Sequence, residues 1–266
     1  MFQAKTKRIK QIASYYSDRI ERLEEILFGK VNVYIDYANV RPWSNKLKWN
    51  IDIKRLKQFL DSFNNIQSVK LYNGTLDSDQ SSKKFSKEAR KLYKENYKTK
   101  AVKIMKQSIN YSSINPNSTD LLEKFIRKCL LLKYKLKTIT FLNDKFKEMN
   151  LNGIYYIEDR KCNFDVEIGR DMLLDYKIDS IDTFILWSGD SDFYEPIKQL
   201  LKDNKKVILF ATVRRISSEL NKLQKDGLLI YDIQKIRNFI CFKKQIDLAL
   251  NNAKRTSCEA PKLWSS

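Results

Sequence analysis

The chain of 266 residues is 42% hydrophobic and carries 51 Lys and Arg against 32 Asp and Glu, a formal net charge of +19. It is long enough for one large domain or a domain with appendages. The excess positive charge favours a polyanionic partner, because each neutralised phosphate releases condensed counterions. Alternatively, the many lysines only keep the protein soluble. Apolar runs are too short for a membrane span, and the charged first 30 residues do not resemble a signal sequence. We therefore expect a cytoplasmic protein without membrane association.

The residue types that are scarce narrow the possible chemistry. Histidine is absent, which excludes Ser-His and Cys-His nucleophilic catalysis and the usual zinc ligand sets. The four cysteines are widely spaced without a C-x-x-C pair, so they predict neither a disulfide framework nor a thiolate metal site. If the protein is an enzyme, carboxylates must carry much of its chemistry.

Strand-like and helix-like segments alternate along the chain from residue 31 onwards. Strands are predicted at residues 31–36, 68–76, 101–108, 182–189, 206–212 and 228–233. Helices are predicted at residues 51–65 and 79–96, from about 171, after 192 and from about 217. This alternation predicts an α/β fold with a doubly wound, mostly parallel sheet and helices on both faces.

Three segments lie outside that pattern. Residues 1–29 predict an N-terminal helical extension, and residues 111–150 predict a helical insertion that is longer than a simple crossover needs. Residues 241–266 predict a C-terminal tail, which leaves residues 30–240 as the main domain. The helical additions are candidate surfaces for a homodimer.

Acidic residues follow two apolar strands. Asp36 ends the run "VNVYID", and Asp190 and Asp192 follow "TFILWSG". Ligands of parallel sheets bind beyond the carboxyl ends of the strands, where these residues lie. Between the two strands in sequence, Asp165 stands near the expected start of a helix. Several carboxylates at one edge would repel one another without a hard cation, and Mg²⁺ or Mn²⁺ prefers such oxygen ligands.

Each acidic residue also has a purely structural interpretation. Asp192 and Glu195 resemble a helix cap, and Asp36 with Asn39 is typical of an Asx turn. Asp165 would be favoured by the dipole at the start of a helix. Asp171 lies about 240° around that helix from Asp165, so we expect a structural role for it. The convergence of two apolar strands on aspartates, in a basic protein, favours the shared site.

Three blocks of the sequence resemble the NYN domain. They are "VYIDYAN", "FDVEIGRDMLLD" and "FILWSGDSDFYEPIKQLLKDNKKVILF", and the order of the blocks is similar to that of the LabA-like or DUF88 branch of the PIN-like nucleases. The resemblance covers roughly residues 31–235. The block from Lys161 to Asp165 is one residue longer than the Lys-Gly-Val-Asp pattern of the family.

The resemblance implies a PIN-like fold and metal-dependent cleavage of RNA by an endoribonuclease. By matching motifs, Asp36, Asp165, Asp190 and Asp192 would surround Mg²⁺ or Mn²⁺. Asn39 and Ser188 would orient water, a carboxylate or a phosphate oxygen. In-line attack of water on the phosphodiester would then need no histidine.

Basic and aromatic residues near the same edge are candidates for holding RNA. The stretch "NVRPWSNKLKWN" interleaves Arg41, Lys46 and Lys48 with Trp43 and Trp49, a pattern typical of phosphate neutralisation combined with base stacking. Further candidates for phosphate contact are Lys161, Arg214 and Arg215. The alternative is that the tryptophans pack against the domain and the arginines are solvated.

Two other functions remain open from the sequence. One is an RNA-binding or regulatory adaptor with the same fold, whose acidic cluster holds a structural metal or none. The other is a related nuclease that acts on DNA, because phosphate contacts do not distinguish the two sugars.

Overall fold

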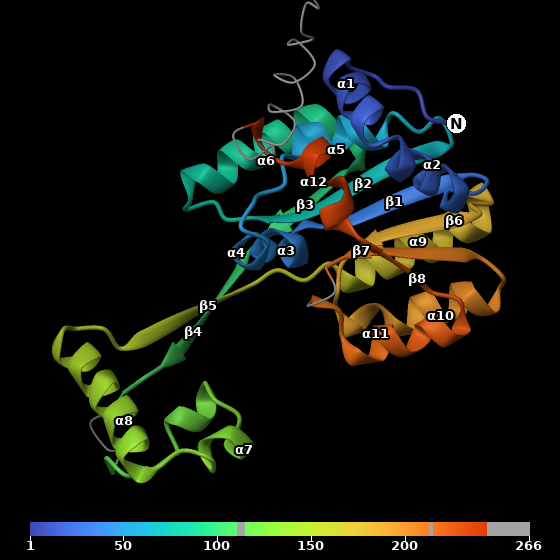
Figure 1. The fold of residues 1–266 in the computed structure, drawn as a ribbon. Helices are drawn as coiled ribbons and strands as arrows, with labels where there is room; N and C mark the ends of the chain where they lie inside the picture. The colour runs from blue at the N-terminus through green and yellow to red at the C-terminus, as the bar shows by residue number, and fades with distance from the viewer. Residues whose placement is uncertain (111–114, 213–214, 244–266) are drawn as a thin grey trace, which may run out of the picture. The chain divides into compact units, whose positions relative to one another are not determined.

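The computed structural model describes residues 1–110, 115–212 and 215–243 (Figure 1). The chain forms two compact units. One contains Met1–Ala101 and the described residues from Asn163 onwards, and the other is Val102–Cys162.

The larger unit is built on a six-stranded sheet with the order β3-β2-β1-β6-β7-β8. All five strand pairs are parallel. The strands are β1 (Val31–Asp36), β2 (Ile66–Thr75), β3 (Tyr97–Ala101), β6 (Thr183–Trp187), β7 (Lys206–Ala211) and β8 (Leu229–Asp232). Every residue of β1 and of β6 is buried, as expected for the central strands of a sheet covered on both faces.

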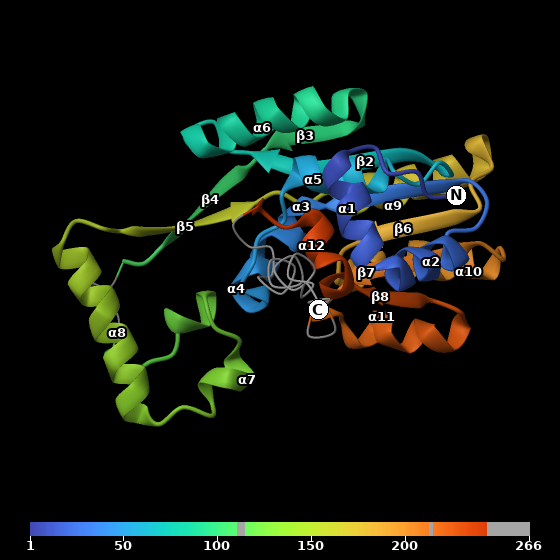
Figure 2. The same cartoon turned by 45° about the horizontal axis from the view of Figure 1, so that its top comes forward.

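Helices flank this sheet, as Figures 1 and 2 show. The longer helices are α1 (Lys7–Tyr15), α2 (Ser17–Ile26), α5 (Ile53–Leu60), α6 (Gln80–Tyr93), α9 (Asp165–Asp179), α10 (Tyr194–Lys202) and α11 (Ser218–Lys222). Single turns of α-helix are α3 (Tyr37–Val40), α4 (Ser44–Leu47) and α12 (Arg237–Ile240), and 3₁₀ turns include η1 (Arg41–Trp43) and η4 (Ser191–Phe193). Together they confirm the predicted α/β fold, which is consistent with a PIN-like domain.

The first 29 residues pack as part of the larger unit. Ile9 of α1 and Leu23 of α2 are buried, and Phe2 forms an isolated antiparallel bridge with Phe63. The Arg8 side chain donates a hydrogen bond of 2.8 Å to the backbone oxygen of Phe239. The N-terminal helices therefore contribute to the hydrophobic core of this unit.

The strand predicted at residues 101–108 is wrong in its placement. Residues up to Ala101 belong to β3 of the main sheet, whereas β4 (Lys103–Ser108) pairs with β5 (Tyr156–Lys161) in an antiparallel ladder. Ile104 and Met105 of β4 are 42% and 45% exposed, so the apolar residues that suggested a core strand are not in the core of the sheet.

The smaller unit, Val102–Cys162, contains the predicted insertion at 111–150 and extends beyond it at both ends, because β4 and β5 belong to this unit. It contains η3 (Leu122–Lys124), α7 (Lys128–Leu131) and α8 (Leu136–Leu151). Leu122, Leu131 and Ile139 form its small core. The buried Asn143 amide donates hydrogen bonds of 2.7 and 2.8 Å to the backbone oxygens of Pro116 and Ser118, which ties α8 to the loop before η3.

Among the described helices, none combines the length and the apolar character that crossing a membrane would require.

Candidate active site

Strand β1 carries polar side chains on one of its faces. The Asn32 amide donates a hydrogen bond of 2.7 Å to Asp175 of α9, and the Tyr34 hydroxyl donates another to the same carboxylate. Since alternate residues of a strand share a face, Asp36 also lies on the face that carries α9. The Asp36 carboxylate therefore lies on the same side of the sheet as α9, the helix that begins with Asp165.

Asp36 is buried and receives only weak hydrogen bonds. Its carboxylate accepts from the backbone N–H of Asn39 and from the Ser188 hydroxyl, both at 3.3 Å. Burial is the main reason that the pKa of Asp36 is raised to about 6; these hydrogen bonds oppose the shift and the charge of Asp190 adds to it. The predicted Asx turn is present as well, because Asp36 caps α3. Within the described residues, no cationic side chain forms an ion pair with Asp36, so its buried charge is not compensated.

The loop after β6 brings Asp190 to the same edge. Its backbone N–H donates to Ser188 Oγ at 3.3 Å, while the Gly189 N–H donates to Asn39 Oδ1 at 3.3 Å. The side chains of Asn39 and Ser188 therefore connect the ends of β1 and β6. Asp190 also accepts from the Asp192 N–H at 3.3 Å as the cap of η4.

Gly189 allows the loop after β7 to approach this turn closely. A Cβ atom at position 189 would stand 1.7 Å from the backbone oxygen of Arg215. The Ser217 N–H donates a hydrogen bond of 3.0 Å to the backbone oxygen of Gly189. The glycine between Ser188 and Asp190 is thus required by packing, since no side chain fits there.

Asp165 begins α9 and faces the same group of carboxylates. Burial is the largest cause of the rise of its pKa to about 7. A hydrogen bond with Asn163 lowers this pKa, whereas the charges of Asp36 and Asp190 and a hydrogen bond with Asp192 raise it. Asp165 therefore lies near carboxylates from two other segments of the chain, Asp36 at the end of β1 and Asp190 after β6.

A pocket of about 510 Å³ opens beside this cluster, between α9 and α10. Asp165 and Asp192 line it, together with Asn163, Glu195 and Gln199. Asp36 and Asp190 do not line it. Asp36 is 5% exposed, so its carboxylate is buried, whereas Asp165 is partly exposed.

The donor set fits a hard divalent cation in chemical type. It offers several carboxylate oxygens and no softer ligand, and like-charge repulsion raises the pKa values of Asp36 and Asp165. In the described part of the chain, however, no three acidic or cysteine side chains are grouped closely enough to form a ready-made metal site. Binding of an ion would therefore have to draw these carboxylates closer together.

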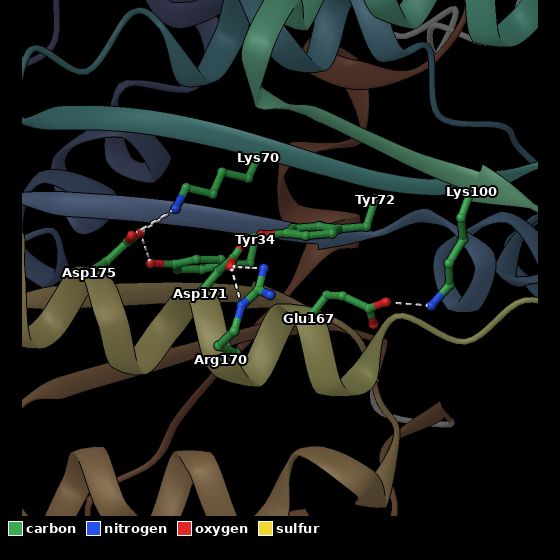
Figure 3. A network of polar contacts seen from close by, with 8 residues as sticks. All are labelled: Tyr34, Lys70, Tyr72, Lys100, Glu167, Arg170, Asp171 and Asp175. Atoms are coloured by element: carbon green, nitrogen blue, oxygen red, sulfur yellow. Dashed lines mark hydrogen bonds and ion pairs between the residues drawn. The ribbon is translucent and has the colours of Figure 1, made fainter.

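A second group of acidic residues lies along α9, beneath β1 and β2 (Figure 3). Asp175 pairs with the Lys70 ammonium at 2.7 Å in addition to Tyr34 and Asn32. Asp171 accepts a hydrogen bond of 2.8 Å from the Tyr72 hydroxyl and pairs with Arg170 at 2.9 Å.

Although burial opposes it, the hydrogen bonds from Arg170 and Tyr72 lower the pKa of Asp171. The structural role expected for Asp171 is confirmed. The role of Asp175 was not predicted, although the alternation of polar residues at 32, 34 and 36 could have indicated it.

The residues predicted to hold RNA differ in their exposure to solvent. Arg41, Lys46, Lys48 and Arg215 are exposed, and Lys161, in the smaller unit, is exposed and 3.7 Å from Asp159. Arg214 lies outside the described residues. The prediction of base stacking by Trp43 is wrong, because its side chain is 2% exposed. Trp43 ends the short turn η1 and packs into the domain, as Trp49 does with 2% exposure.

Comparison with protein families matches residues 122–230 to the NYN domain. The resemblance indicated by the sequence blocks is thereby confirmed for the NYN family, but not for the LabA-like branch. NYN domains are PIN-like nucleases that generally use divalent metal ions, so the match supports a nuclease-type function. The matched residues include Asp165, Asp190 and Asp192 and begin after Asp36.

Among solved structures, the chain is similar to VPA0982 from Vibrio parahaemolyticus RIMD 2210633, which is described as a protein of unknown function. The two are 15% identical, and the alignment covers 80% of this chain and 96% of that chain with a TM-score of 0.46. Comparison with curated proteins finds no match.

Proposed function

We propose that this protein is an endoribonuclease that depends on Mg²⁺ or Mn²⁺ and hydrolyses RNA phosphodiester bonds at the edge formed by Asp36, Asp165 and Asp190. The observation that carries the proposal is the arrangement of acidic residues from three separate segments of the chain. Ser188 links Asp36 to Asp190 by hydrogen bonds, and Asp165 lines a pocket together with Asp192. The protein carries a formal charge of +19, yet several carboxylates lie at this edge of the sheet. They would repel a phosphate unless a cation neutralised them.

The chain's own residues have distinct tasks in this proposal. Asp36, Asp165 and Asp190 would hold the cation, and Asp192 at the rim would complete its surroundings. A divalent ion bound there would activate water and neutralise charge on the phosphate and the leaving oxygen.

Ser188 and Asn39 act as positioning residues. The Ser188 hydroxyl donates to Asp36 and accepts from the Asp190 N–H, so it fixes these two carboxylates relative to each other. The Asn39 side chain holds the Gly189 N–H and connects the same two loops. Arg41, Lys46, Lys48 and Arg215 would contact the RNA backbone, because all four are exposed.

The proposal is tested by cleavage of a covalently closed, labelled RNA and of a DNA of matched sequence. A closed RNA has no ends, so only an endonuclease can open it. Each substrate is incubated with Mn²⁺, Mg²⁺ or EDTA, using wild type, Asp190→Asn and the control Asp179→Asn, whose side chain is exposed at the end of α9. We expect metal-dependent opening of the RNA, a loss of about 100-fold or more for Asp190→Asn, and no loss for the control.

The same experiment separates the alternatives. Cleavage of DNA but not RNA would show a deoxyribonuclease. Binding of RNA without cleavage under any condition would favour the adaptor, which the lack of a ready-made metal group among the described residues also favours.

A further inference from the structure

A second pocket of about 540 Å³ lies at the β3 edge of the main sheet. Its walls are the end of α6, strand β3 and the first half of α9. Five cationic residues line it: Arg90, Lys94, Lys98, Lys100 and Arg170. None of them is among the residues predicted from the sequence to hold RNA.

Two of these cations are neutralised by acidic residues of the same pocket. Lys100 pairs with Glu167 at 2.6 Å, and Arg170 pairs with Asp171 at 2.9 Å (Figure 3). Within the described residues, no ion pair involves Arg90, Lys94 or Lys98, and all three residues are exposed. The pocket therefore presents three uncompensated positive charges to solvent.

The floor of the pocket is aromatic but offers no open ring face. Tyr72, Tyr97 and Phe164 are 0%, 7% and 4% exposed. The Tyr72 hydroxyl is engaged by Asp171, and the Tyr97 hydroxyl donates to Ser86 Oγ at 3.2 Å. Bases could not stack on these buried rings. The pocket therefore offers positive charge for phosphates and few groups that would distinguish one base from another.

Strand register places Lys98 of this pocket level with Asp36 and on the same face of the sheet. Asp36 of β1 pairs with Tyr72 of β2, and Tyr72 pairs with Lys98 of β3. Residues paired in this way share a face of the sheet, and neighbouring strands are about 4.8 Å apart. The backbone of Lys98 is therefore about 10 Å from that of Asp36, on the face that α9 covers.

The backbone of Lys94 is unusual for a lysine. Its φ of 50° and ψ of −124° form a combination that glycine adopts much more easily than other residues. Lys94 lines the pocket in this strained conformation, which makes it a candidate for contact with a ligand.

We propose that this basic pocket binds phosphates of the nucleic-acid strand whose scissile bond lies at Asp36, Asp165 and Asp190. The inference rests on the proposed function and extends it by naming a path for the substrate. Arg90, Lys94 and Lys98 contact the backbone and not the bases, so binding here is independent of sequence and strongly weakened by salt.

The test measures binding of a fluorescein-labelled single-stranded RNA in EDTA, with every variant built on Asp190→Asn so that cleavage does not interfere. Arg90→Ala/Lys98→Ala is compared with Lys222→Ala/Lys225→Ala, which removes two exposed cations near the β8 edge. We expect the pocket variant to bind about tenfold more weakly. For this variant, the slope of log K against the logarithm of the salt concentration should be less steep by about 1.4, which is the value for two lost phosphate contacts on a single strand. The control should change neither quantity.

Lys94→Gly provides an independent test that is insensitive to misfolding. Glycine relieves the backbone conformation at position 94, so the melting temperature should rise while RNA affinity falls. A structural lysine would show the first change without the second.

Two results would overturn the proposal. If Arg90→Ala/Lys98→Ala binds RNA as the control does, the pocket does not hold the strand, and Lys98 only protects the edge strand β3 from pairing with other chains. If inorganic pyrophosphate displaces RNA at concentrations comparable to those of the RNA phosphates, the pocket is a site for small phosphate compounds. Because binding is measured without metal, a failure of RNA cleavage leaves this test intact, and the two proposals can fail separately.

Discussion

The aspartates around α9 fall into two groups with opposite electrostatic surroundings. Asp171 and Asp175, beneath β1 and β2, are matched by Arg170, Tyr72, Lys70 and Tyr34. Asp36 and Asp190, at the carboxyl ends of β1 and β6, and Asp165, at the start of α9, make no ion pair within the described residues. Burial and, to a smaller extent, the neighbouring carboxylates raise the pKa of Asp36 and of Asp165.

Under the proposed function, this difference separates carboxylates that hold the fold together from carboxylates that would bind a cation. A buried charge that is paired within the protein holds α9 against the sheet, and its removal leaves the partner unsatisfied. A buried charge that is left without a cation costs stability and is retained for another reason.

The largest effect is expected for Asp175→Ala. Its removal leaves the Lys70 ammonium, whose side chain is 15% exposed, and the Tyr34 hydroxyl without their shared acceptor. Breaking a buried pair in this way costs about 3–5 kcal/mol, so the midpoint of urea unfolding should fall steeply. Asp179→Ala on the exposed end of the same helix should cost almost nothing. A loss below about 1 kcal/mol would show that the network is not part of what holds α9 in place.

Gly189→Ala should have an intermediate effect on stability and a larger one on cleavage. The new Cβ would meet the Arg215 backbone oxygen at 1.7 Å, so one of the two loops has to move. Overpacking of this kind costs about 1–3 kcal/mol, measured by urea unfolding. Because Asp190 follows directly, RNA cleavage should fall further than stability alone explains.

Asp36→Asn should stabilise the protein in the absence of metal. Burial and the charge of Asp190 both disfavour the Asp36 carboxylate, while an amide at this position keeps the acceptor for the Asn39 N–H and can donate to Ser188 Oγ. We expect the free energy of unfolding in EDTA at neutral pH to rise by about 1 kcal/mol. A loss of stability would mean that the Asp36 carboxylate is a structural cap and belongs with Asp171.

The smallest effect is a change in acid sensitivity for Asp171→Asn. The pKa of Asp171 is lowered in the folded protein, so its contribution to stability is complete above the unfolded pKa near 3.8 and is lost as pH falls through the folded value. The variant should be less stable than wild type at pH 6, and this difference should shrink as the pH falls below about 4. Urea unfolding at a series of pH values measures it, and a difference that does not vary with pH would exclude the ionised form as the cause.

Several features of this comparison could be predicted from the sequence. Mostly apolar runs before Asp36 and Asp190 indicated buried strands, and these two residues lie at the same edge because the strands β1 and β6 are neighbours and parallel. The helical arithmetic that separated Asp171 from Asp165 was sufficient to place them in different groups.

Other features depend on packing that the local sequence does not determine. Trp43 stands among basic residues, as a stacking residue would, but the turn η1 directs it into the core. The apolar residues of β4 indicated a core strand, yet they are partly exposed in a two-stranded ladder. The basic pocket combines α6, β3 and α9, so no single stretch of sequence reveals it.

The central claim is that the two groups of aspartates differ in their need for a cation, and thermal unfolding with and without Mn²⁺ tests it most directly. An ion that binds only the folded protein raises its melting temperature by mass action. We expect Mn²⁺ to raise the melting temperature of wild type and not that of Asp190→Asn. Asp175→Asn should melt at a lower temperature yet retain the full increase with Mn²⁺. Equal increases for wild type and Asp190→Asn, or no increase for wild type, would contradict the account.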